Sequence, residues 1–186
     1  AVMIDLDGTL ADTIPDLAEA ANRMLRELAR PVLEPALIRT FVGKGIPKLV
    51  ERALAGGLEG RVDERLLARA LPIYERCYTE VNGRHTVIFP GVHEGLQRLR
   101  AMRLPLACVT NKPERFTLPL LAGLGLAPYL DLTMSGDSLP RKKPDPLPLT
   151  HCAQFFAVPV SRLLMVGDSP GDTGAARAAG CPVFCV

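Results

Sequence analysis

Four short apolar runs in the sequence are each followed by polar side chains that could do chemistry. The polar segments are Asp5-Leu6-Asp7-Gly8-Thr9, Thr110-Asn111-Lys112, Arg141-Lys142-Lys143-Pro144-Asp145, and Gly167-Asp168-Ser169 with Asp172. Carboxylates that converge without paired cations repel one another and take up protons. A hard divalent cation removes this repulsion, and oxygen ligands without His or Cys favour Mg²⁺ over zinc.

A magnesium ion held by a few carboxylates retains coordination positions for water and for a phosphate oxygen. Lysine, threonine and backbone amides suit the negative charge that remains on a phosphoryl group. A carboxylate can itself attack phosphorus and form an aspartyl-phosphate. The segments therefore predict metal-assisted phosphoryl transfer, provided that the fold brings them together.

The apolar runs have the length and composition of buried parallel strands. There are five such runs, and the polar segments follow the first four; they span Val2–Ile4, Leu106–Val109, Leu130–Met134, Leu163–Val166 and Val183–Val186. Helical patterns between the later runs cover Val92–Met102, Pro113–Ala122, Pro146–Phe156 and Gly171–Ala179. Repeated strand–helix–strand units predict an α/β fold, a Rossmann-like parallel sheet sandwiched by helices. Such sheets bind ligands outside the carboxyl ends of their strands, where the polar segments stand.

One stretch near the N-terminus breaks this alternation. From about Ala11 to His85 the sequence predicts no strand and shows only helical periodicity. Two apolar stripes at helical spacing are Leu17, Ala20, Ala21, Met24, Leu25 and Leu28, and Leu66, Leu67, Ala70, Leu71, Tyr74 and Tyr78. We therefore expect a core of residues 1–11 and 86–186, and a small all-helical domain of residues 12–85 inserted after the first strand.

Composition narrows the class of protein. The chain has 186 residues, 48% of them apolar and 23% charged, which is typical of a globular domain. Its 22 basic and 20 acidic residues are too balanced to indicate a nucleic-acid or membrane surface. Five cysteines lack C-x-x-C spacing, and Cys108 and Cys185 lie in apolar runs, so we expect buried free thiols in a reducing cytosol. No export signal opens the sequence, and we expect a cytoplasmic location.

The four polar segments resemble, in order and spacing, the motifs of the haloacid-dehalogenase-like hydrolases. The resemblance covers almost the whole chain, and it implies that the helical insert is the cap found in one subgroup of that superfamily. It also implies that Asp5 is the nucleophile and a Mg²⁺ ligand. Asp7 would protonate the leaving alkoxide, activate the hydrolytic water and bind the metal through its backbone carbonyl. The dehalogenases of the superfamily lack this second aspartate, so its presence favours a phosphatase or a phosphomutase.

The resemblance implies roles for the later segments as well. Thr110 would hydrogen-bond a phosphate oxygen, with help from the amide of Asn111. Lys143, which precedes a proline as in the family, would balance the charge between the nucleophile and the phosphate. Asp168 would complete the metal ligands, and Asp172 would act as a ligand through water or as a support. We expect three other lysines to be solvated charges, namely Lys48, Lys112 and Lys142.

Longer strings are similar to those of the phosphoglycolate phosphatases within this superfamily. They run from Asp5 to Leu17, from Phe41 to Gly45 and from Gly136 to Pro146. The implied partner is a small phosphorylated metabolite, 2-phosphoglycolate, with neither nucleic acid nor membrane; monomer and homodimer are equally compatible with the composition. A second anionic group on the substrate needs its own cation, and Gly43 and Lys44 in the insert could supply backbone amides and a charge.

Two other interpretations stay open from the sequence. All four motifs would be shared by a phosphatase, exopolyphosphatase-like enzyme or phosphomutase of the same superfamily that acts on another phosphate. One example is a β-phosphoglucomutase-like enzyme that acts on a sugar phosphate. A binding scaffold that has lost catalysis would share the fold. The intact Asp5, Asp7, Lys143 and Asp168 argue against a scaffold, because four converging charges are costly without a function.

Overall fold

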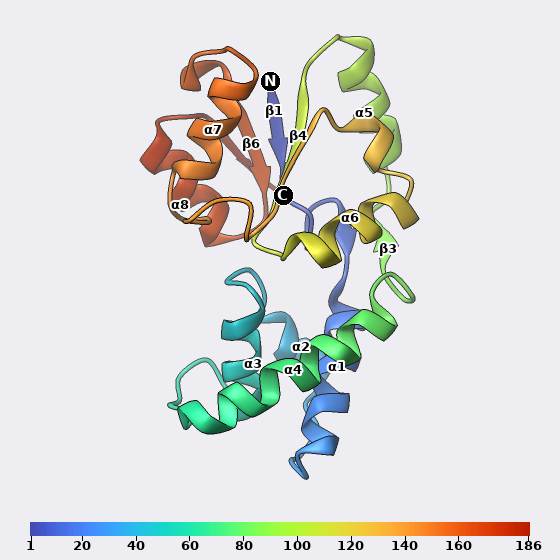
Figure 1. Ribbon diagram of the computed structural model, residues 1–186. Helices are drawn as coiled ribbons and strands as arrows, with labels where there is room; N and C mark the ends of the chain where they lie inside the picture. The colour runs from blue at the N-terminus through green and yellow to red at the C-terminus, as the bar shows by residue number, and fades with distance from the viewer. The chain divides into compact units, whose positions relative to one another are not determined.

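The chain folds into two compact units, which a computed structural model describes over all 186 residues. The first unit comprises residues 1–12 and 88–186, and the second comprises residues 13–87 (Figure 1). The sequence predicted the two divisions after residues 11 and 85. That the second unit acts as a cap stays a prediction.

The first unit contains a five-stranded parallel sheet with the strand order β5-β4-β1-β6-β7. Its strands are β1 (Val2–Ile4), β4 (Leu106–Val109), β5 (Leu132–Met134), β6 (Leu164–Gly167) and β7 (Val183–Cys185). The central strand is in register with both neighbours, because Met3 pairs with Ala107 on one side and with Met165 on the other. The predicted α/β class and the Rossmann-like parallel sheet are confirmed.

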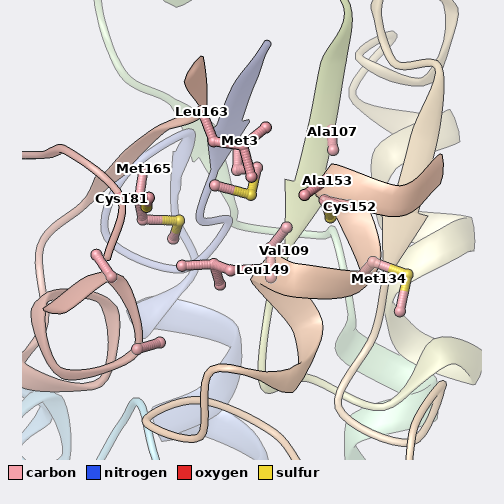
Figure 2. Packing of buried hydrophobic residues seen from close by; sticks show 12 residues of the cluster. Met3, Ala107, Val109, Met134, Leu149, Cys152, Ala153, Leu163, Met165 and Cys181 are labelled. Carbon is pink, nitrogen blue, oxygen red and sulfur yellow. The ribbon is translucent and has the colours of Figure 1, made fainter. Parts of the chain in front are cut away.

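Helices cover both faces of this sheet. One face packs against α5 (Val92–Ala101) and α6 (Glu114–Gly123), and the other against α7 (Leu147–Phe155) and α8 (Pro170–Ala179). Two short 3₁₀ helices, η1 (Ala127–Tyr129) and η2 (Val160–Arg162), lie in the connections. Strand side chains alternate between the faces: Met3 packs toward α7, whereas Val2 and Ile4 pack toward α5. Figure 2 shows the buried hydrophobic cluster on the α7 face, which includes Met3, Val109 and Leu149.

The strand order decides which polar segments meet. Strand β1 lies between β4 and β6, and all three run in the same direction. The residues that follow these strands, Asp5, Thr110 and Asp168, therefore emerge at one edge of the sheet. The chain continues from β1 outward to β4 and β5 and then returns to β6, so this edge is a topological switch point, where ligands of α/β sheets bind.

The second unit is helical. It contains α1 (Ile14–Glu27), α2 (Pro35–Arg39), α3 (Ile46–Ala55) and α4 (Glu64–Val81). Helices α1 and α4 pack together along the two predicted stripes, with Met24 and Tyr78 fully buried. The rings of Tyr74 and Tyr78 stack at 5.8 Å between centroids. No helix of either unit is both long enough and apolar enough to span a membrane.

Two expectations about local structure are wrong. Ala11–Asp12 forms a strand, β2, which pairs with β3 (Val87–Ile88); two residues are too few to show the alternation that marks a strand in sequence. Cys185 is exposed, whereas Cys77, Cys108, Cys152 and Cys181 are buried free thiols as expected. Cys185 lies on β7, which is at the edge of the sheet and has a neighbouring strand on one side only, so its apolar sequence did not ensure burial.

A buried carboxylate holds the end of the helical unit to its beginning. Asp16, in the first turn of α1, is fully buried and accepts hydrogen bonds from the backbone amides of Gly83, His85 and Thr86 at 2.9–3.1 Å. The hydroxyl of Thr86 donates a fourth at 2.6 Å. One side chain thus satisfies three backbone donors of the segment that leaves α4.

Replacing Asp16 by alanine is expected to lower the free energy of unfolding by about 3 kcal/mol or more, because several buried donors lose their acceptor. Urea denaturation of the purified chain measures this loss. Asp16→Asn, which retains one carbonyl acceptor, should lie between alanine and wild type. An Asp16→Ala variant that unfolds at the wild-type urea concentration would show that the segment holds itself without the carboxylate.

Candidate active site

Asp5 and Lys143 form a buried ion pair at the end of the central strand. The distance from Lys143 Nζ to Asp5 Oδ1 is 3.0 Å, and the side chains are 3% and 8% exposed. The same Oδ1 accepts a hydrogen bond from the backbone amide of Leu6 at 2.8 Å. Lys143 Nζ also donates to the carbonyl of Val109 at 2.5 Å and to Asp172 at 2.6 Å. Its three acceptors match the three protons of an ammonium group, so the lysine is held firmly.

Asp172 is held from two sides at the start of α8. Its Oδ1 accepts from Lys143, and its Oδ2 accepts from the hydroxyl of Ser169 at 2.7 Å and from the Ser169 amide at 3.0 Å. Ser169 is the N-cap of α8 and completes a reciprocal capping box with Asp172. Asp172 has no exposed surface. Its carboxylate therefore orients Lys143 and anchors the helix that follows β6.

Asp168 packs against the turn that follows β1. One carboxylate oxygen from each of Asp5, Asp168 and Asp172 lies within 4.8 Å of the others. Thr9 Oγ1 donates to Asp168 Oδ1 at 3.4 Å. Gly8 in this turn has a φ of +87°, and a Cβ there would lie 2.2 Å from Asp168 Oδ2. Only glycine allows this backbone to approach the Asp168 carboxylate so closely.

Lys112 is buried against Asp7, which corrects the expectation that it is a solvated charge. Lys112 Nζ lies 2.7 Å from Asp7 Oδ1, and the two side chains are 3% and 13% exposed. The sequence contained one signal of this arrangement, since Lys112 comes two residues after Thr110 at the same edge of the sheet. Lys142, by contrast, is half-buried beside a surface hollow lined by Gly136, Pro140 and Arg141, and it makes no ion pair.

The residues after β4 connect the strand ends to one another. Thr110 is buried, and its Oγ1 accepts a hydrogen bond from the Lys112 amide at 3.2 Å. The side-chain amide of Asn111 donates to the carbonyl of Lys143 at 2.8 Å. Asn111 therefore positions the segment that carries Lys143, a role that the sequence did not suggest.

Burial and mutual repulsion control the charges of this cluster. Burial, opposed by Lys143 and reinforced by Asp172 and Asp7, raises the pKa of Asp5 to about 7. Burial also raises the pKa of Asp168, with the negative charge of Asp172 acting in the same direction. Burial lowers the pKa of Lys143, but Asp5 and Asp172 outweigh it, and the net shift is upward. The lysine therefore stays charged. The ionised forms of Asp5 and Asp168 are disfavoured, and a bound cation would stabilise them.

The structure brings together six of the residues singled out in the sequence: Asp5, Asp7, Thr110, Lys143, Asp168 and Asp172. Asn111 lies beside them. Gly43 and Lys44 belong to the second unit, in the segment between α2 and α3. Gly43 and Gly45 have positive φ angles of 98° and 85°, and Lys44 between them is exposed. The assembled edge combines clustered carboxylates, a charged lysine and a hydroxyl, which is a set of groups suited to a metal ion and a phosphoryl group.

Comparisons with known proteins identify the family of this chain. The haloacid dehalogenase-like hydrolase family matches residues 1–180, and the chain belongs to this family of hydrolases. A phosphoglycolate phosphatase of Nitrosospira multiformis is 56% identical over 186 residues, which are 100% of this chain and 82% of that protein. A phosphoglycolate phosphatase of Thiobacillus denitrificans is 53% identical over the same shares of the two chains. The crystal structure of a predicted phosphoglycolate phosphatase from Haemophilus somnus superposes with a TM-score of 0.92 at 33% identity, covering 99% of this chain and 83% of that one.

Proposed function

We propose that this chain is a Mg²⁺-dependent phosphomonoester hydrolase that forms an aspartyl-phosphate on Asp5 and acts on 2-phosphoglycolate. The observation that carries the proposal is the buried Asp5 carboxylate, held by Lys143 at 3.0 Å beside Asp168 and Asp172. Both of its contacts, from Lys143 and from Leu6, go to Oδ1. Oδ2 is thereby left to attack phosphorus or to bind a metal.

The residues present fit a magnesium ion. The cluster of Asp5, Asp168 and Asp172 offers only carboxylate oxygens, the ligands that Mg²⁺ prefers. When Asp7 is ionised as well, there are four carboxylates against Lys112 and Lys143, a formal charge of −2 that one divalent cation neutralises. In this proposal Asp5, Asp168 and the backbone carbonyl of Asp7 hold the ion. Asp172 supports them indirectly, through water or by orienting Lys143, because both of its oxygens are already hydrogen-bonded.

In the proposed reaction, Asp5 attacks phosphorus while the bond from phosphorus to the leaving oxygen breaks, and protonated Asp7 gives its proton to that oxygen. Asp7, now ionised, then takes a proton from water as the water attacks the aspartyl-phosphate and releases phosphate and Asp5. Lys143, the hydroxyl of Thr110 and the amide of Asn111 stabilise the negative phosphoryl oxygens. The bound metal ion adds positive charge that offsets the repulsion between the phosphate and Asp5.

The choice of substrate is supported by the relatives. Two proteins named phosphoglycolate phosphatase are more than half identical to this chain along its whole length. Release of inorganic phosphate from 2-phosphoglycolate, sugar phosphates and nucleotides, with Mg²⁺ and with EDTA, tests the proposal. We expect a strong preference for 2-phosphoglycolate and loss of turnover in EDTA. A preference for sugar phosphates would retain the mechanism but replace the substrate, and no turnover on any ester would support a binding scaffold.

We further propose that the loop from Gly43 to Gly45 closes over the site and binds the carboxylate of the substrate through Lys44. Its support is the exposed lysine between two glycines of positive φ, a geometry that presents backbone amides and a cation together. Closure would also exclude water during phosphoryl transfer. In this proposal the substrate is a small phosphorylated metabolite and the enzyme acts in the cytoplasm. The cytoplasmic location is supported by the five cysteines, which are all free.

Lys44→Ala is expected to raise KM for 2-phosphoglycolate about tenfold and to change kcat much less, because it removes a charge-assisted contact made equally in the ground and transition states. Steady-state kinetics on the variant provide the measurement. Lys48→Ala is the matched control, since Lys48 pairs with Glu51 on the surface of the same unit. Unchanged kinetics for Lys44→Ala would remove the lysine from the proposed binding loop.

A further inference from the structure

Two buried lysines divide the carboxylates of the site between them. Lys143 contacts Asp5 and Asp172, whereas the ion pair of Asp7 is with Lys112. Lys112 is 105 positions away from Asp7 in the sequence, and its side chain crosses from the end of β4 to the turn after β1. With only 3% of its side chain exposed, this lysine has given up most of its hydration. Such a buried charge is costly unless a close partner or a function requires it.

The backbone around Lys112 is fixed by contacts of its own. Its amide donates to Thr110 Oγ1 at 3.2 Å, and its carbonyl accepts from the Gly136 amide at 2.8 Å and from Thr117 Oγ1 at 3.1 Å. A Cβ at Gly136 would lie 2.2 Å from the carbonyl oxygen of Asn111, so the segment after β5 packs directly on this turn. The anchor of the lysine is therefore rigid, and the ammonium group approaches Asp7 from a defined direction.

Asp7 stands further from the end of the strand than Asp5 does. Asp5 directly follows β1 and is held by Lys143 and by the Leu6 amide. Asp7 stands two residues further, in the turn that Gly8 closes with a positive φ, and its side chain is more exposed. Proton transfer requires the carboxyl group to lie within hydrogen-bond reach of the leaving oxygen. A contact to Oδ1 limits rotation of the carboxyl group and so sets where its other oxygen can point.

We propose that Lys112 is a positioning residue for Asp7, holding its carboxyl group in place for proton transfer to the leaving oxygen. This inference rests on the proposed function, in which Asp7 protonates the leaving alkoxide and then accepts a proton from water. Lys112 gains and loses no proton in either step. Its effect is largest for alkyl esters, because an alkoxide leaves only as it is protonated. An aryl ester such as p-nitrophenyl phosphate releases an anion that carries its charge without a proton, so its release depends little on Asp7. The later hydrolysis of the aspartyl-phosphate uses Asp7 for both esters.

The test compares two substrates across variants of the full chain. In single-turnover reactions, Lys112→Met is expected to lower the rate of leaving-group release from 2-phosphoglycolate about 100-fold with little change in KM, and the rate of release from p-nitrophenyl phosphate less than about fivefold. Asp7→Asn should show the same selectivity for the leaving group. In the double variant, Lys112→Met should add little to the loss from Asp7→Asn alone, because the lysine acts through the aspartate. Lys112→Arg retains the cation and should recover part of the alkyl-ester activity. If the methionine variant does not fold, the arginine variant is compared with the wild type in its place.

Lys48→Met makes the same chemical change at a surface ion pair and should leave both activities at the wild-type level. Equal losses on the two esters, a change confined to KM, or additive losses in the double variant would each overturn the proposal. If the wild-type chain cleaves other alkyl phosphates but not 2-phosphoglycolate, the substrate proposal fails and the same comparison on glycerol 3-phosphate decides the role of Lys112. If it cleaves p-nitrophenyl phosphate alone, or no phosphate ester, the role of Lys112 fails as well.

Discussion

Replacing Asp5 by asparagine is expected to reduce phosphate release by at least about four orders of magnitude, because an amide cannot take up the phosphoryl group. The measurement is single-turnover reaction with ³²P-labelled substrate, quenched in acid. The wild-type chain should retain label during turnover, and Asp5→Asn should retain none. Asp7→Asn with a labelled aryl phosphate is the matched control: the nucleophile is in place and the leaving group needs no proton, so label should still bind to Asp5 and then be released slowly. Normal turnover by Asp5→Asn would remove Asp5 from the nucleophilic step.

The same substitution is expected to alter the pH dependence of stability in EDTA. The pKa of Asp5 is raised by burial from 3.8 to about 7 in the folded chain. Between these values the folded state binds more protons at Asp5 than the unfolded state does, so the contribution of Asp5 to the free energy of unfolding falls as the pH rises. It is complete below about pH 4 and is lost by about pH 7.

Asp5→Asn should therefore match the wild type in stability near pH 4 and exceed it near pH 8, when both are unfolded by urea in EDTA. Added Mg²⁺ should stabilise the wild type more at pH 8 than at pH 6, because the ion requires ionised ligands. A difference between variant and wild type that stays constant with pH would show that folding does not raise the pKa of Asp5.

Lys143→Met is expected to lower the free energy of unfolding by about 3–5 kcal/mol and to abolish measurable turnover. Its ammonium group contacts Asp5, Asp172 and the carbonyl of Val109, and its side chain is 3% exposed. Removing it leaves two buried carboxylates facing each other without a cation. Urea denaturation in EDTA measures the loss of stability.

Lys142→Met is the matched control, because the neighbouring lysine is half-buried and makes no ion pair. Its stability should stay within about 0.5 kcal/mol of the wild type. Adding Asp172→Asn to Lys143→Met should restore part of the lost stability by removing one of the two unpaired charges, while turnover stays absent. If both lysine variants are equally stable, the ion pairs of Lys143 contribute little to the fold.

The sequence by itself was sufficient to predict the sheet and which polar segments meet at its edge. Short apolar runs identified the strands, and parallel strands must end at one edge, so residue spacing alone placed Asp5, Thr110 and Asp168 together. The helical stripes around Met24 and Tyr78 likewise predicted the packing of α1 on α4. These features depend on local periodicity and on backbone direction, both of which are encoded in the order of apolar and polar residues.

Only the tertiary structure decided which lysines enter the site. Lys112 and Lys142 both stand beside a motif, yet the first is buried against Asp7 and the second stays near the surface. Residue spacing in the sequence likewise did not predict the backbone donors to Asp16 or the exposure of Cys185. A lysine has a long flexible stem, and whether its charge reaches a buried carboxylate depends on the packing of segments that are distant in the chain. The order of residues therefore determines where the strands end, whereas the contacts between those ends determine which charges meet.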